Sequence, residues 1–120
     1  RPLHTILPAM LKEKGGAFTP FGVMGGGYQP CGHARFVSNL TDAGLDLQAA
    51  VDAPRAFADA GILKLERGYA PEVMQALTDL GHRVEVPAGP LGGAQAIRML
   101  PSGVLMAGSD PRKDGCAIGY

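Results

Sequence analysis

The sequence predicts an α+β fold in which most strands pair in an antiparallel manner. First, several short segments alternate apolar and polar residues, whereas others repeat apolar residues at helical spacing. Second, 18 glycines and 10 prolines place tight turns between these segments. Third, the expected order is strand, strand, helix, helix, strand, helix, strand, strand, strand. This order keeps paired strands apart from helices, as is typical of the α+β class.

The first two strands should form a hairpin. Residues 5–12 are mostly apolar, residues 13–16 read Glu-Lys-Gly-Gly, and residues 17–23 return as the second strand. Pro8 and Pro20 have no amide hydrogen for a sheet ladder, so we expect each at an edge or a bulge.

Two helices should follow the hairpin. Pro30 suits a first helical turn, which predicts a helix over residues 30–43 with Gly44 as its C-cap. Asp46 is the expected N-cap of a second helix over residues 47–52. The apolar residues at helical spacing in the first helix are Ala34, Val37 and Leu40, with Cys31 as a further candidate.

The second half of the chain should alternate one helix with short strands. Residues 62–66 read as a short strand near a sheet edge, and residues 71–80 as a helix opened by proline. Strands are expected at residues 83–86, 94–99 and 104–107, and the tail after them has no period.

Length and composition fit one domain with a single core. Lysine plus arginine equal aspartate plus glutamate at 11 each, without charge runs, so nothing predicts a nucleic-acid partner. No apolar stretch approaches the roughly 20 residues of a membrane-spanning helix. We therefore expect a soluble protein, and its compartment, cytoplasmic or periplasmic, stays open.

Cysteines and histidines give no metal pattern. Cys31 and Cys116 lie outside any Cys-x-x-Cys spacing, and we expect both to be buried free thiols. The three histidines lack ligand spacing, so neither a metal nor a cofactor is expected, and His33 and His82 are interpreted as surface or supporting groups. Arg55 is expected to be partly buried and paired with a carboxylate.

The most informative stretch is residues 21–30, where an apolar strand runs into Gly25, Gly26 and Gly27 before a helix. Glycine permits positive φ and close approach of another group, and the first amides of a helix have no partner within it. Such a corner can bind a phosphate, a carboxylate or the oxyanion of an acyl-transfer intermediate. The alternative is a turn whose glycines serve packing alone.

Six motifs in order resemble the C-terminal part of γ-glutamyltransferases (γ-glutamyltranspeptidases), over essentially the whole chain. They are His4-Thr5-Ile6-x-Pro8, Phe21-Gly22-Val23-Met24-Gly25-Gly26, Gln29-Pro30-x-Gly32-His33, Ala53-Pro54-Arg55, Gly92-Gly93-x-Gln95-x-Ile97, and Gly108-Ser109-Asp110-Pro111-Arg112-x-Asp114-Gly115-x-Ala117-x-Gly119-Tyr120.

The resemblance implies an N-terminal nucleophile hydrolase with a four-layer α-β-β-α fold, made as a precursor that cleaves itself into a large and a small subunit. It implies that residues 1–120 are the C-terminal portion of the small subunit and that the nucleophilic threonine lies upstream. The family's paired oxyanion-hole glycines fall on Gly25 and Gly26. By the same resemblance, the large subunit and the rest of the small subunit are partners, and the fragment alone is inactive.

The substrate-binding pair departs from the family pattern. Two serines of well-studied γ-glutamyltransferases correspond here to His4 and Thr5. The resemblance therefore implies either a γ-glutamyl amide such as glutathione or another small acyl amide as the substrate.

Two further hypotheses remain open. The corner could bind a nucleotide, although neither Gly-x-Gly-x-x-Gly nor Gly-x-x-x-x-Gly-Lys-Ser/Thr is present. The chain could also be a non-catalytic homologue. Apolar surface intended for the rest of the protein favours self-association of the fragment.

Overall fold

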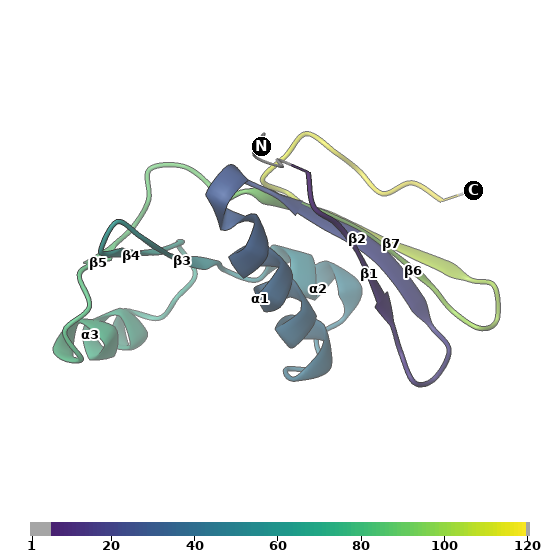
Figure 1. Ribbon diagram of the computed structural model, residues 1–120, viewed down its shortest axis with the longest axis horizontal. Coiled ribbons are helices and arrows are strands. Elements are labelled where there is room, and N and C mark those ends of the chain that lie inside the picture. Colours follow the sequence, from purple (N-terminus) through teal and green to yellow (C-terminus); the bar gives the residue numbers. More distant parts are fainter. Residues whose placement is uncertain (1–5, 120) are drawn as a thin grey trace, which may run out of the picture. The chain divides into compact units, whose positions relative to one another are not determined.

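The computed structural model describes residues 6–119, which form parts of two compact units (Figure 1). One unit comprises the described residues of Arg1–Asp52 and Gly92–Tyr120. The other is Ala53–Leu91. Each unit is described by itself.

The first unit contains a four-stranded antiparallel sheet in the order β1-β2-β6-β7. Its strands are β1 (Pro8–Lys12), β2 (Phe18–Met24), β6 (Gly93–Met99) and β7 (Leu105–Ser109). The predicted N-terminal hairpin is confirmed, because β1 pairs with β2 and the Gly16 amide donates to the Glu13 carbonyl in the turn.

The two prolines of this sheet behave differently. Pro8 lies on the edge strand β1, as predicted. Pro20 lies on β2, between β1 and β6, so its predicted edge or bulge position is wrong. The sheet accommodates it because the pairing of β2 with β6 runs from Phe18 to Met24 with a gap at Thr19 and Pro20, without an extra residue.

Helices α1 (Gln29–Thr41) and α2 (Leu47–Asp52) cover one face of this sheet (Figure 1). Pro30 lies in the first turn of α1, and the Ala49 amide donates to Oδ1 of Asp46 at 2.8 Å, which confirms the predicted cap. The C-cap of α1 is Asp42, so the prediction of Gly44 is wrong, although Gly44 has φ +64° just beyond it.

The core of the first unit lies between this sheet face and the helices. Its most buried members come from both layers and include Phe21, Val23, Tyr28, Phe36, Leu47, Ala50, Val51, Ala94 and Ala96. The predicted apolar stripe of α1 is out of phase, since Ala34 is exposed and the buried positions are Gln29, Gly32, Phe36 and Asn39. Gly32 explains the shift, because a Cβ there would lie 2.5 Å from Cγ1 of Val23, so the helix rests on β2 where it has no side chain.

The opposite face of the sheet is apolar and exposed. Cross-strand register places Met10, Met24, Ile97, Met99 and Leu105 on this face, and each is at least 43% exposed. The expected exposed apolar surface is therefore present, whereas self-association stays a prediction.

The second unit contains the sheet β3-β4-β5 and one helix. Its elements are β3 (Ala56–Asp59), β4 (Ile62–Leu65), α3 (Pro71–Asp79) and β5 (Val84–Glu85). Strand β4 is central, so its predicted edge position is wrong. The reason is β3, which sequence analysis missed and which pairs antiparallel with β4, whereas β5 pairs parallel with β4.

The two cysteines also differ from expectation. Both Cys31 and Cys116 are free and exposed, so the prediction of buried thiols is wrong. Cys31 lies on the exposed side of α1, next to the buried Gly32.

Candidate functional site

The glycine run forms an exposed corner between β2 and the helical segment that follows. Strand β2 ends at Met24, a 3₁₀ turn η1 spans Gly26–Tyr28, and α1 begins at Gln29. Gly25 has φ +129° and Gly26 has φ +59°, conformations that favour glycine. The sequence-predicted strand-to-helix corner is thus confirmed, with an additional 3₁₀ turn.

The hydrogen bonds at this corner use carbonyl groups. The Gly25 carbonyl accepts from the Tyr28 amide at 3.1 Å, and the Gly26 carbonyl accepts from the Gln29 amide. Among residues 6–119, neither the Gly25 nor the Gly26 amide donates one of the hydrogen bonds that close loops and caps. Both glycines are exposed.

Tyr28 fixes the shape of the corner from beneath. Tyr28 is 3% exposed, and its ring lies close to three glycines that sequence analysis did not connect with it. A Cβ would lie 3.4 Å from the ring atom Cδ1 at Gly25, 3.1 Å from it at Gly92, and 2.7 Å from Cε1 at Gly32. A side chain at Gly92 or Gly32 would therefore press on the ring or displace it, whereas at Gly25 the added Cβ would only contact it.

The start of β6 packs directly against the corner. Gly92 has φ +68°, and a Cβ there would lie 2.1 Å from the Met24 carbonyl oxygen. The same approach appears at Gly25, whose Cβ would lie 3.0 Å from the Gly92 Cα. Gly92 of the Gly92-Gly93 motif thus has a physical reason, since only glycine permits this contact between backbones.

A buried carboxylate anchors this part of β6. Asp110 is fully buried, and its Oδ2 accepts from the Ala94 amide at 2.6 Å. Its Oδ1 accepts from the amide and the guanidinium of Arg112, at 2.9 and 3.1 Å. The Arg112 guanidinium also donates to the carbonyls of Val51 and Asp52. This polar network around Asp110 and Arg112 joins the tail to α2 and β6.

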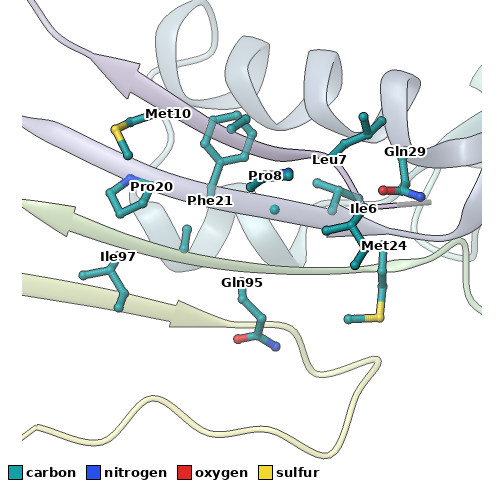
Figure 2. Close-up of a pocket in the computed structure, with 14 residues that line it drawn as sticks. Ile6, Leu7, Pro8, Met10, Pro20, Phe21, Met24, Gln29, Gln95 and Ile97 are labelled. Carbon is teal, nitrogen blue, oxygen red and sulfur yellow. The ribbon is translucent and has the colours of Figure 1, made fainter. Parts of the chain in front are cut away.

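An apolar hollow of about 510 Å³ lies on the open face of the sheet beside the corner (Figure 2). Met24 and Gln29, which flank the glycines, both line it. Ile6, the first described residue, lies near them at the same end in the view. An apolar hollow with a few amide groups at its edge suits a small uncharged or partly polar group.

The other two predicted site residues, His4 and Thr5, lie outside the described residues. The chain that follows them is described and is held by His33, whose Nε2 lies 2.7 Å from the Leu7 carbonyl oxygen. Sequence analysis missed this contact because it joins residues 26 positions apart. Within residues 6–119, no cluster of three potential metal ligands occurs, and no helix has the length and apolar character needed to cross a membrane.

Comparison with known proteins identifies the family. The sequence model described as Gamma-glutamyltranspeptidase matches residues 1–120. The chain belongs to the γ-glutamyltranspeptidase family. This confirms the resemblance seen in the six sequence motifs.

Curated relatives of this γ-glutamyltranspeptidase-family chain are named as proenzymes. It is 36% identical to the oxamate amidohydrolase proenzyme of Klebsiella pneumoniae, with 100% of the chain and 24% of the relative aligned. It is 34% identical to the glutathione hydrolase-like YwrD proenzyme of Bacillus subtilis, with 99% and 24% aligned. The chain thus spans about a quarter of the length of these relatives.

Solved structures of the family share the fold. The chain superposes on γ-glutamyltranspeptidase from Pseudomonas nitroreducens with a TM-score of 0.87, covering 100% of this chain and 64% of that one, at 24% identity. The chain therefore shares the fold of this γ-glutamyltranspeptidase, and the predicted α+β class is confirmed.

Proposed function

We propose that residues 1–120 are the C-terminal part of the small subunit of an autoprocessing amide hydrolase or acyltransferase. In this proposal the Gly25 and Gly26 amides form the oxyanion hole. The observation that carries it is the exposed corner, where two amides that donate none of the loop and cap hydrogen bonds among residues 6–119 lie beside a hollow, in a chain that matches the family model over residues 1–120.

In the proposed reaction the corner stabilises a negatively charged oxygen but does not supply the nucleophile. A nucleophilic threonine at the start of the small subunit, upstream of this sequence, attacks the substrate amide carbonyl while its α-amine accepts the hydroxyl proton. The carbonyl oxygen becomes an oxyanion, which the two glycine amides stabilise. The intermediate collapses as the leaving amine takes up the proton and departs. Water or an acceptor amine then attacks the acyl-enzyme and regenerates threonine.

In this proposal, the segment that precedes β1 binds the acyl group of the substrate. We propose that His4 and Thr5 bind its polar end, since a threonine hydroxyl and an imidazole can both hydrogen-bond a carboxylate or an amide. The large subunit and the N-terminal part of the small subunit complete the pocket. The 120-residue chain alone is inactive because it lacks the nucleophile.

The leading substrate class is γ-glutamyl amides, including glutathione. A different small acyl amide is the second candidate. It is favoured by the 36% identity to a protein named oxamate amidohydrolase and by His4 at a position where well-studied γ-glutamyltransferases have serine. The third possibility is that the protein is a non-catalytic homologue, and the experiment must distinguish it from the two substrate classes.

The test uses the full-length precursor. Electrophoresis and intact mass measure self-cleavage, and amine or ammonia release is measured with γ-glutamyl p-nitroanilide, glutathione and oxamate. We expect cleavage into two subunits and turnover of at least one amide, both abolished when the threonine at the cleavage junction is replaced by alanine. Turnover of oxamate alone assigns the second substrate class. Self-cleavage without release from any amide would contradict an enzymatic function.

A further inference from the structure

His33 joins two segments that flank the proposed site. It lies on α1 and is half-buried. Its Nε2 lies 2.7 Å from the Leu7 carbonyl oxygen, and its Nδ1 lies 2.7 Å from the Gln29 carbonyl oxygen. Its ring packs against Phe21 of β2, with 5.2 Å between ring centroids. The imidazole therefore bridges the backbone before β1 and the first turn of α1.

The direction of these hydrogen bonds is fixed by chemistry. A carbonyl oxygen only accepts, so a ring nitrogen that forms either bond does so as the donor. The bond to Gln29 stays within α1, at a spacing of four residues. The bond to Leu7 links segments 26 residues apart and is the one that holds the start of β1 to the helix.

The two ends of this bridge lie close in sequence to the proposed site residues. Leu7 follows Thr5 by two residues, a length of chain that spans at most about 7 Å. Gln29 follows Gly26 by three residues, and its side of α1 is buried. Leu7 and Gln29 also both line the hollow, so any movement of Leu7 relative to α1 changes the hollow beside the proposed oxyanion hole.

We propose that His33 is a positioning residue that sets the acyl-binding segment against the oxyanion corner by holding the Leu7 carbonyl. This inference rests on the proposed function and deepens it, because it assigns substrate affinity to a residue outside the pocket pair. The bond to Leu7 is exposed, so it adds little to the stability of the fold. Its loss should therefore appear in acyl-donor binding more than in unfolding.

Two substitutions separate the two ring nitrogens. In His33→Gln the side-chain amide nitrogen takes about the place of Nε2, so it can still donate to Leu7. In His33→Asn the shorter side chain places its amide nitrogen near Nδ1, so it can donate to Gln29 but does not reach Leu7. His82→Asn, at an exposed histidine of the other compact unit, is the matched control.

Steady-state kinetics of the full-length protein on its preferred amide give the readout. We expect His33→Asn to raise KM for the acyl donor about five- to tenfold, since one oriented hydrogen bond is lost, while kcat changes less than about twofold. His33→Gln and His82→Asn should keep KM near the wild-type value. Equal KM for the asparagine and glutamine variants, or a fall in kcat at unchanged KM, would overturn the positioning role.

If the His33→Asn precursor does not cleave itself, hydrogen–deuterium exchange tests the inference instead. Peptides containing Leu7 should exchange faster in the asparagine variant of the precursor and at the wild-type rate in the glutamine variant. Identical exchange in all three proteins would overturn the inference. If the wild-type protein self-cleaves but turns over no amide, the proposed function itself fails, which is a separate result from equal KM values in an active enzyme.

Discussion

Gly92→Ala is the sharpest perturbation of the corner that leaves the proposed oxyanion glycines, Gly25 and Gly26, unsubstituted. The new Cβ would lie 2.1 Å from the Met24 carbonyl oxygen and 3.1 Å from Cδ1 of Tyr28. Real Cβ atoms do not approach a carbonyl so closely, so β2 and the start of β6 must move apart. Because Met24 precedes Gly25 directly, this movement displaces the two amides.

The magnitude has two parts. Placing alanine at φ +68° costs about 1–2 kcal/mol, and the forced backbone shift costs about 1–3 kcal/mol more. Gly44→Ala measures the first part alone, since Gly44 has φ +64° and, among the described residues, no heavy atom lies within 4 Å of its added Cβ. The pair therefore isolates the steric contribution.

The assay is urea unfolding of the full-length protein followed by circular dichroism, together with kcat on its preferred amide. We expect Gly92→Ala to lower the free energy of unfolding by about 2–5 kcal/mol and to lower kcat, whereas Gly44→Ala costs about 1–2 kcal/mol and leaves kcat unchanged. Equal destabilisation by the two substitutions would refute the reasoning, because the contact with Met24 would then cost nothing.

Two further predictions concern the layers that support the corner. Gly32→Ala should destabilise the protein, because the added Cβ would lie 2.5 Å from the buried Val23. This holds although alanine favours a helix over glycine by about 1 kcal/mol. A raised urea midpoint would contradict this packing. Asp110→Ala should lower the free energy of unfolding by about 3–5 kcal/mol, because it leaves the Arg112 guanidinium without the carboxylate. Asp110→Asn should recover part of this loss, because its side-chain oxygen still accepts a hydrogen bond. Equal destabilisation by both variants would show that packing, not hydrogen bonding, accounts for the loss of stability.

The elements of the first unit could largely be predicted from the sequence because local signals agree there. The hairpin, the helix opened by Pro30 and the cap at Asp46 each depend on residues close in sequence. The corner at Gly25 and Gly26 was predictable for the same reason, since an apolar strand, a glycine run and a helix start follow one another.

The errors arise where tertiary contacts override local pattern. Strand β3 was missed because the turn that joins it to β4 has positive φ at both Ala60 and Gly61, and alanine gives no hairpin signal. The buried face of α1 was misplaced because Gly32, the residue of closest contact, has no apolar side chain to count.

The supporting residues of the site could not be predicted for a similar reason. The packing of Gly92 on Met24 and the contact of His33 with Leu7 join segments far apart in the chain. The glycine motif indicated that residues 92 and 93 matter, but only the fold shows which atoms they approach.

Replacing the Gly26 amide by an ester tests the proposed oxyanion hole most directly. Glycolic acid incorporated at position 26 of the full-length protein removes one N–H and adds no side chain, and the same replacement at Gly44 is the control. The proposal predicts that kcat falls about 10²–10³-fold at nearly unchanged KM, while the control keeps its activity. A kcat at position 26 that equals that of the control would contradict the assignment of this corner as the oxyanion hole.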